Sequence, residues 1–348
     1  MALDFKTYQE TKDFMKKKLS GIVPDIEIPY KAELVFEINQ LKKKKSVVIL
    51  GHNYMEPALF LGVPDIVGDS LFLSRQAALT DKDTIIFCGV RFMAETAKIL
   101  NPKKTVLLPA KEAGCSLAAS ITAEDVIELR RKFPNIPIVA YINTYADVKA
   151  EVDYCCTSGN AVELVKKIPS DTIIFLPDEY LAKNVAKETG KKVIVATKEL
   201  NKSNLADDVQ MIAWNGKCEV HEKFTVQDIE NVRKQFPDVY VLAHPECSPE
   251  VVAKSDYSGS TTAMVNAVKN SKNKRFLILT ECSMGDNIIA ENPDKELIRM
   301  CSVRCQHMNQ ITLEDIIHAL NYNETLIDVP EDIRIRAKLS VDRMLAVG

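Results

Sequence analysis

The pentapeptide Asp-Thr-Ile-Ile-Phe occurs twice in the chain, at residues 83–87 and again at 171–175, an offset of 88 positions. The same offset separates the lysine pairs that begin at Lys103 and Lys191, each of which precedes a run of apolar residues. A repeat of fixed period decides the architecture before any local pattern does. Because this period is the size of a small domain, the sequence predicts a duplicated α/β unit rather than a solenoid of short repeats.

A third, looser copy of the unit follows the first two. It has an apolar run at 239–243, a helical pattern at 259–270 and a second apolar run at 275–279. In all three copies, short β-branched runs typical of buried strands alternate with segments typical of helices. Strands that alternate with helices form parallel sheets covered by helices. We therefore expect an α/β fold of three pseudo-threefold-related, three-layer αβα domains with parallel sheets.

The repeat also predicts where the units begin and end. We expect N-terminal helices at 1–45, a first αβα repeat at 46–115, a second at 116–218, a third at 219–305 and C-terminal helices at 306–348. Pro330 divides the last segment into two helices, because proline cannot continue a helix. The second unit is about 15 residues longer than the first, and we assign the extra residues to a polar loop at 197–211.

Composition limits the classes of function. The 348 residues are 46% hydrophobic and 27% charged, as in ordinary globular proteins, and the net charge is -3. Nucleic-acid-binding proteins usually carry a clustered basic face, so we expect no nucleic-acid partner. No apolar run approaches the roughly 20 residues of a membrane span, and the amphipathic N-terminus does not resemble a secretory signal. We therefore expect a cytoplasmic protein without a membrane partner.

Three of the nine cysteines stand apart from the others. Cys115, Cys218 and Cys305 each close one unit, whereas the remaining cysteines are more typical of small core residues. Pseudo-threefold packing of the units brings the three sulfurs to one place. Three thiolates without an obvious fourth suit an iron–sulfur cluster with one open iron, which acts as a Lewis acid. A zinc clip at Cys301 and Cys305 is less favoured, since no second ligand pair at finger-like spacing follows.

Polar side chains follow the first strand of every unit. They form the tripeptides His52-Asn53-Tyr54, Tyr141-Ile142-Asn143 and His244-Pro245-Glu246. A later helix of each unit is expected to begin at a hydroxyl residue: Ser70, Ser158, or Ser260 with Thr261. Ligands bind at the carboxyl ends of strands in open α/β sheets, and helix N-termini bind anions. Each hydroxyl alone is as readily a plain helix cap, but three equivalent positions indicate one shared pocket.

These segments resemble the quinolinate synthase (NadA) family. The resemblance runs from about residue 46 to residue 316 and is carried by ILGHNYMEPAL, VGDSLFLSRQAA, AGCSLA, VAYINTYADVKA, CTSGNAVE, GKCEVHEKF, VLAHPEC, GSTTAM and CQHMNQITLED. It implies three related α/β domains around a central [4Fe-4S] cluster, with Cys115, Cys218 and Cys305 as ligands and one iron open. It implies an enzyme of NAD biosynthesis that condenses iminosuccinate (iminoaspartate) with dihydroxyacetone phosphate to give quinolinate, phosphate and water. It also implies dependence on an L-aspartate oxidase or equivalent, which supplies the unstable imine.

The resemblance also implies site residues. The substrate-binding residues carried over are His52, Ser70, Tyr141, Asn143, Ser158, His244, Glu246, Ser260 and Thr261. For catalysis we expect proton transfers by Tyr54, Tyr141 and Glu246. His52 and His244 are expected to assist or orient, because imidazole titrates near neutrality. His221, three residues after Cys218, is expected to support the ligand sphere from outside.

Two other functions remain open at this stage. One is a different hydro-lyase that acts on small carboxylates with the same cluster, and the other is a non-catalytic iron–sulfur sensor. A helix-turn-helix with basic flanks, expected of a DNA-binding sensor, is not apparent in the sequence. An assay for quinolinate formation from the two named substrates separates these functions.

Overall fold

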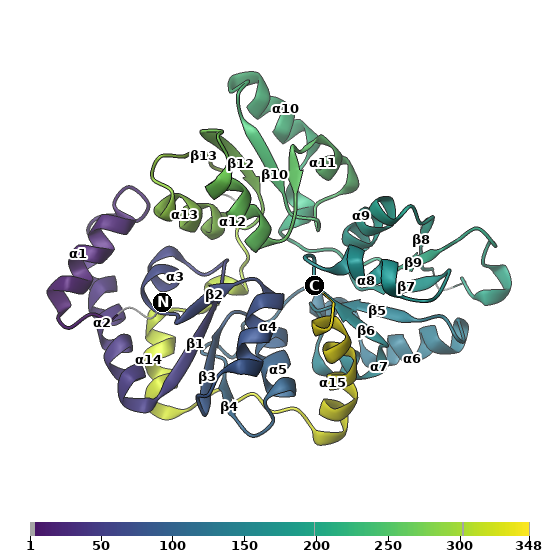
Figure 1. The fold of residues 1–348 in the computed structure, drawn as a ribbon, viewed down its shortest axis with the longest axis horizontal. Coiled ribbons are helices and arrows are strands. Elements are labelled where there is room, and N and C mark those ends of the chain that lie inside the picture. The colour runs from purple at the N-terminus through teal and green to yellow at the C-terminus, as the bar shows by residue number, and fades with distance from the viewer. Residues whose placement is uncertain (1–3, 198, 301–302, 348) are drawn as a thin grey trace.

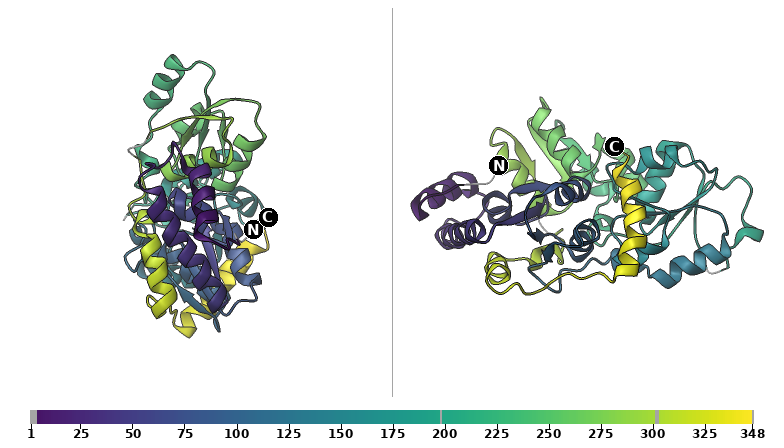
Figure 2. Two further views of the ribbon diagram at one scale, coloured as in Figure 1. Left: turned by 90° about the vertical axis from the view of Figure 1, so that its left-hand side faces the viewer. Right: turned by 60° about the horizontal axis from the view of Figure 1, so that its bottom comes forward.

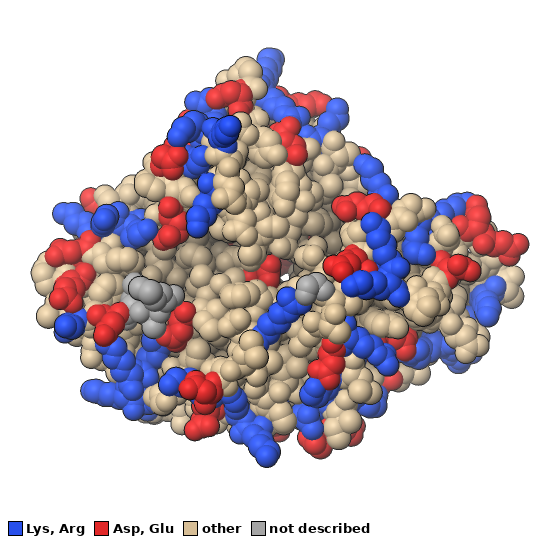
Figure 3. Space-filling view, in the orientation of Figure 1, with Lys and Arg blue, Asp and Glu red and all other residues tan. Residues whose placement is uncertain are grey.

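The structure is a computed structural model that describes residues 4–197, 199–300 and 303–347. These described residues form three parallel sheets, each flanked by helices, and we call each sheet with its helices a lobe. The three lobes meet at the centre of the molecule (Figure 1). This arrangement confirms the predicted α/β fold with three αβα units. Basic and acidic side chains are interspersed over the face shown in Figure 3.

The first and third lobes share one strand order. The first sheet runs β2 (Ile66–Gly68), β1 (Val47–His52), β3 (Thr84–Cys88), β4 (Thr105–Leu107). The third runs β11 (Tyr257–Ser258), β10 (Tyr240–Ala243), β12 (Arg275–Leu279), β13 (Glu296–Ile298). Their helices are α3 (Pro57–Gly62), α4 (Ser70–Leu79) and α5 (Arg91–Leu100) in the first lobe, and α10 (Val226–Gln235), α11 (Pro249–Lys254), α12 (Thr261–Asn270) and α13 (Cys282–Glu291) in the third. The repeat seen in the sequence is thus a repeat of topology.

The second lobe has one additional strand. Its sheet runs β6 (Tyr154–Cys156), β5 (Ile138–Tyr141), β7 (Ile173–Leu176), β9 (Met211–Ala213), β8 (Val193–Val195). Its helices are α6 (Ala123–Lys132), α7 (Ala146–Glu151), α8 (Ala161–Lys167) and α9 (Glu179–Thr189). β9 pairs with β7 in the place that β4 and β13 take in the other lobes, and β8 lies outside it. The prediction of a loop through all of 197–211 is therefore wrong at its end, because Met211 begins β9.

The central strand pairs have equivalent registers in the three lobes. Gly51 pairs with Cys88, Ala140 with Leu176 and Ala243 with Leu279. The next residue along each first strand, His52, Tyr141 or His244, therefore lies near the start of the helix that follows β3, β7 or β12. Those helices are α5, α9 and α13, so each lobe presents the same two loops at the carboxyl end of its sheet.

A recurring set of polar contacts fixes the first strand of each lobe. An aspartate accepts a hydrogen bond from a backbone N–H of the strand and pairs with a cation on the preceding helix. The sets are Asp65 with Ile49 N (2.9 Å) and Lys42 (3.0 Å), Asp153 with Ile138 N (2.8 Å) and Arg130 (3.0 Å), and Asp256 with Val241 N (2.7 Å) and Arg233 (2.9 Å). Because the aspartates are only partly exposed, each contact specifies where the strand begins.

Among the described residues, four helices toward the chain ends complete the fold. They are α1 (Tyr8–Leu19), α2 (Ile28–Lys45), α14 (Leu313–Tyr322) and α15 (Glu331–Leu345). α2 takes the place in the first lobe that α6 and α10 take in the others, and α14 packs against it. α15 packs against α7 and β6, and Figure 2 shows it running along the second lobe. In the described residues, no helix combines the length and apolar character needed to cross a membrane.

Candidate active site

A cavity lies where the three lobes meet. It is lined by all thirteen residues predicted as catalytic, substrate-binding or metal-binding: His52, Tyr54, Ser70, Cys115, Tyr141, Asn143, Ser158, Cys218, His244, Glu246, Ser260, Thr261 and Cys305. Residues as far apart in the chain as His52 and Cys305 therefore share one pocket. The carboxyl ends of all three sheets contribute to it, as expected for α/β proteins.

The three cysteines occupy equivalent turns. A 3₁₀ turn begins three residues after each of them: η1 (Ala118–Ser120), η3 (His221–Lys223) and η4 (Met308–Gln310). The backbone N–H groups two and three positions later donate hydrogen bonds to each sulfur. Seven positions after each cysteine, a threonine begins the next helix with a capping box: Thr122, Thr225 and Thr312. The thiols thus come from three copies of one local structure.

The environment of the thiols suits a bound cation. Burial, with smaller contributions from Cys305 and Glu246, raises the pKa of Cys115 to about 12, and burial raises that of Cys305 to about 11. Burial and the charge of Glu246 hold the pKa of Cys218 well above its usual value. Three thiolates at one place repel each other unless a metal compensates their charge. Among the described residues lining the cavity these are the only cysteines, so the donor set fits a cluster held at three irons.

A second possible donor set includes one of these cysteines. The ligand atoms of Cys218, His221 and Glu246 lie within 4.8 Å of one another, so they can hold a metal ion. However, His221 Nδ1 is only 2.6 Å from Glu246 Oε2. Two ligands of one tetrahedral metal at ~2.1 Å lie roughly 3.4 Å apart. The observed separation is that of a charge-assisted hydrogen bond, which favours the three-cysteine set.

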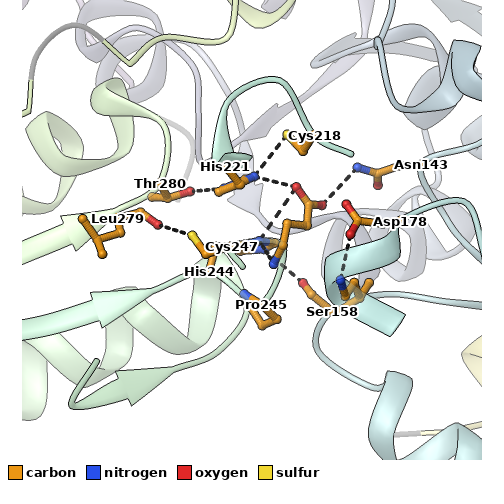
Figure 4. A network of polar contacts seen from close by, with 12 residues as sticks. Asn143, Ser158, Asp178, Cys218, His221, His244, Pro245, Cys247, Leu279 and Thr280 are labelled. Carbon is orange, nitrogen blue, oxygen red and sulfur yellow. Dashed lines mark hydrogen bonds and ion pairs between the residues drawn. The ribbon is translucent and has the colours of Figure 1, made fainter. Parts of the chain in front are cut away.

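Two buried histidines at equivalent positions are neutral hydrogen-bond donors. Nδ1 of His52 accepts the backbone N–H of Tyr54 (3.2 Å), and Nδ1 of His244 accepts that of Glu246 (3.3 Å). Burial lowers the pKa of His52 to about 4 and that of His244 to about 3. The single proton of each ring therefore sits on Nε2. In His244 this group contacts the hydroxyl of Ser158 at 3.2 Å (Figure 4).

Glu246 is a buried carboxylate. Burial alone raises its pKa, but the adjacent imidazoles of His221 and His244 and the hydrogen bonds from His221 and Tyr141 outweigh burial and lower the pKa overall. The amide nitrogen of Asn143 lies 3.4 Å from Oε1 of Glu246. The Glu246 side chain is almost fully buried, at 3% exposure. The site thus keeps one negative charge away from water.

A series of hydrogen bonds connects Glu246 to Tyr54. Nε2 of His221 lies 2.9 Å from Oγ1 of Thr280, and that oxygen lies 2.5 Å from the hydroxyl of Tyr54. Burial, followed by the charge of Glu246, holds the pKa of Tyr54 and of Tyr141 well above the usual value. Both phenols are therefore protonated, so they can act as acids toward a bound molecule.

The predicted helix starts are correct in two lobes and wrong in one. Ser70 is the first residue of α4 and Ser260 caps α12, with Thr261 following it. Ser158 lies three residues before α8, which begins at Ala161. The helix starts later because the backbone N–H of Thr157 bonds to the side chain of Asn160 and forms a turn. Ser158 still reaches the cavity from that turn.

Sequence reasoning missed two buried polar groups at the site. Thr280 links His221 and Tyr54, and Asp178 caps α9 through Leu181 N at 2.7 Å. Burial, then the charge of Glu246, holds the pKa of Asp178 well above its usual value. Thr280 directly follows β12, and Asp178 lies two residues after β7, whereas the predicted residues lie at or just after the ends of β1, β5 and β10. The same signal, a polar residue at a strand end, identifies both when it is applied to β7 and β12.

Comparison with known proteins places these residues in a family. The profile of the family described as "Quinolinate synthetase A protein" matches residues 36–346. The chain is 49% identical to quinolinate synthase 2 of Mesorhizobium japonicum over 341 residues, 98% of this chain and 99% of the relative. It is 51% identical to the quinolinate synthase of Xylella fastidiosa over 315 residues, 90% of this chain and 86% of the relative. It is 48% identical to the quinolinate synthase of Agrobacterium fabrum over 330 residues, which cover 95% of this chain and 90% of the relative.

Proposed function

The chain belongs to the quinolinate synthase family, and we propose that it condenses iminosuccinate with dihydroxyacetone phosphate to quinolinate, phosphate and water, a step of NAD biosynthesis. The observation that carries this proposal is the shared cavity. It brings three thiols, three imidazoles, two phenols and the carboxylates of Asp69 and Glu246 to one enclosed space. Such a set can bind small anionic substrates and move protons among them.

We propose a [4Fe-4S] cluster as the cofactor, held by Cys115, Cys218 and Cys305. When bound, such a cluster offers one open iron as a Lewis acid for a substrate oxygen or nitrogen. The protein holds the sulfurs in place through the backbone N–H groups described above, which favour the thiolate form.

The substrates carry carboxylates and a phosphate, yet the described residues that line the cavity include no lysine or arginine. We assign anion binding to neutral donors instead. These are Nε2 of His52 and His244, the side chains of Asn143 and Ser158, and the starts of α4 and α12 with Ser70, Ser260 and Thr261. Helix N-termini attract anions through free N–H groups and the helix dipole.

The proton transfers follow from the protonation states. Glu246, ionised, takes the proton that must leave the carbon next to the imine. Tyr54 and Tyr141, protonated, donate to oxygens that leave as water or to the developing oxyanion. The series from Glu246 through His221 and Thr280 to Tyr54 supplies a path by which a proton taken up at one end is replaced at the other.

We further propose that the protein acts in the cytoplasm and depends on an L-aspartate oxidase or an equivalent enzyme. The reason is chemical. An unconjugated imine hydrolyses in water, so a reaction that makes iminosuccinate must supply it continuously.

Anaerobic purification with iron and sulfide counts, an absorbance spectrum and a quinolinate assay tests the proposal. We expect about four irons and four sulfides per chain and quinolinate formation only when both substrates are present. A loaded cluster without quinolinate would indicate a different hydro-lyase or a sensor. Quinolinate formation by metal-free protein would contradict the cofactor assignment.

A further inference from the structure

Two buried asparagines occupy the same position in two lobes. Asn184 lies six residues after Asp178, the N-cap of α9, and Asn287 lies six residues after Glu281, the N-cap of α13. α9 and α13 are equivalent helices, since both follow the central strand of their sheets. Neither asparagine lines the cavity, and both are nearly inaccessible, with exposures of 4% and 2%.

Each asparagine holds the residues on both sides of one active-site residue. The amide nitrogen of Asn287 donates to the backbone carbonyls of Asn53 (3.0 Å) and Met55 (2.9 Å), which flank Tyr54. The amide nitrogen of Asn184 donates to those of Pro245 (2.8 Å) and Cys247 (2.9 Å), which flank Glu246. Both N–H bonds of each amide are therefore used on a single short loop.

The chemistry of the contact selects for asparagine. Both partners are carbonyl oxygens, so only the nitrogen of the amide can face them, and the orientation of the group is unambiguous. The other atom, Oδ1, has no hydrogen-bond partner in either residue among the described part of the chain. A buried acceptor without a donor is costly. The fold retains this cost at both positions, which indicates that the two donated bonds matter more.

The contacts cross from one lobe to the next in a single rotational sense. α9 of the second lobe holds a loop of the third, and α13 of the third holds a loop of the first. The remaining pair of lobes is joined through α5 of the first lobe. There Glu95 accepts a hydrogen bond from the backbone N–H of Ala146 in the second lobe, at 2.9 Å. Each strand-end loop of the site is therefore supported by the neighbouring lobe as well as by its own sheet.

We propose that Asn184 and Asn287 are positioning residues that align Glu246 and Tyr54, respectively, through the backbone on either side of each. The alignment of both groups then depends on how the lobes pack. This inference rests on the proposed function, because it takes Glu246 and Tyr54 as groups that exchange protons with the substrate. A displacement of about 1 Å in a catalytic group can lower turnover about 100-fold.

The chain offers a matched control. Asn39 on α2 is also buried, donates from one amide nitrogen to two carbonyls, Val35 O and Gly62 O at 2.8 Å each, and has an unpartnered Oδ1 among the described residues. Its partners lie outside the cavity. Asn39→Ala therefore removes the same number of donated hydrogen bonds without changing any contact at the cavity.

The first test compares Asn184→Ala, Asn287→Ala and Asn39→Ala, each with its iron content and melting temperature measured. We expect similar losses of stability in all three, and a fall in kcat of about 10- to 100-fold only in the first two, with KM changed less than about threefold. Asn184→Ser and Asn287→Ser, which keep one donor, should recover part of kcat. An unchanged kcat in folded, iron-loaded Asn184→Ala and Asn287→Ala, or an equal loss in Asn39→Ala, overturns the inference.

The second test does not depend on turnover. Hydrogen–deuterium exchange should increase at residues 52–56 in Asn287→Ala and at residues 244–248 in Asn184→Ala, each without the other. Increases at both loops in either variant, or at neither, contradict the assignment of one loop to each asparagine. If the wild-type enzyme is inactive but the two variants show these loop-specific increases in exchange, only the proposed function is refuted. The support of each loop by its asparagine is then established.

Discussion

Nδ1 of His221 lies 2.6 Å from Oε2 of Glu246, although His221 follows the second sheet and Glu246 follows β10 of the third sheet. This contact explains how a carboxylate with only 3% exposure stays ionised. Burial favours the neutral acid, but the adjacent imidazoles and donated hydrogen bonds favour the anion more. A base that is ionised and shielded from water is suited to removing a proton from carbon.

Glu246→Gln should keep the cofactor and lose turnover. The amide has nearly the shape of the carboxylate and can still contact His221, but it cannot take up a proton. We expect kcat to fall at least about 100-fold, with iron content unchanged. Stopped assays of quinolinate on anaerobically loaded enzyme measure this, and an active Gln variant would remove Glu246 from the catalytic residues.

Cys218→Ser should lose iron. A serine oxygen is a poor replacement for thiolate at iron, and Cys218 lies in the cavity with the other two thiols. Cys88→Ala is the control, because Cys88 is fully buried in β3 and does not line the cavity. Iron and sulfide analysis should show depletion in the first variant only. A full complement of four irons in Cys218→Ser would exclude it as a ligand.

The fold was largely predictable because the repeat is local and explicit. The recurrence at 83–87 and 171–175 marks β3 and β7, and capping and proline signals mark the ends of most helices. The sequence did not reveal that β9 is inserted beside β7 with β8 outside it. Both segments are short apolar runs, and which of two runs pairs with a central strand is decided by tertiary packing rather than by local pattern.

The site was predictable where each residue lies at a strand end, and less so elsewhere. The first and third residues of each strand-end tripeptide line the cavity, and the middle residues Asn53, Ile142 and Pro245 do not. Thr280 and Asp178 escaped notice because their role depends on side chains from other lobes. Asn184 and Asn287 lie in the middle of helices, where a single asparagine has no distinguishing pattern. Their partners are backbone atoms of a neighbouring lobe, which no spacing rule in one sequence indicates.

The neutral histidines predict a loss of stability in acid. The pKa of His52 is about 4 and that of His244 about 3, both below the unfolded value of 6.5. Below pH 6.5 the unfolded chain therefore binds protons that the folded chain does not. The free energy of unfolding should decrease as pH falls from 6.5 to about 4, by up to about 1.4 kcal/mol per pH unit for each histidine.

Urea unfolding of His244→Gln between pH 4 and pH 7 tests this. Glutamine keeps a donor near Ser158 but does not titrate, so the dependence on pH should become shallower. His318→Gln serves as the control, since the His318 side chain is 54% exposed. A slope that His244→Gln leaves unchanged would show that the ring is not neutral in the folded protein.

The three capping boxes predict equal effects in the three copies. Thr122, Thr225 and Thr312 each accept a backbone N–H with the hydroxyl, at 3.3, 3.2 and 3.1 Å. Replacement of any one by alanine should lower the free energy of unfolding by about 1 kcal/mol, and replacement by serine by much less. Denaturant titration measures these changes. A clearly larger loss at one position would indicate that this threonine also supports the neighbouring cysteine turn.

Thr280→Val should lower turnover without unfolding the protein. Valine has the shape of threonine but no hydroxyl, so the contacts of 2.9 Å to His221 and 2.5 Å to Tyr54 are lost while the packing is retained. Because Tyr54 then loses the group that replaces its proton, kcat should fall about 100-fold, and Thr280→Ser should recover most of it. Steady-state kinetics with iron content as the control separates this from loss of the cofactor. If Thr280→Val and Thr280→Ser have equal activity, the hydroxyl takes no part in proton transfer. Tyr54 then exchanges its proton with solvent, with substrate, or with Nε2 of His221, which lies 3.4 Å from its hydroxyl.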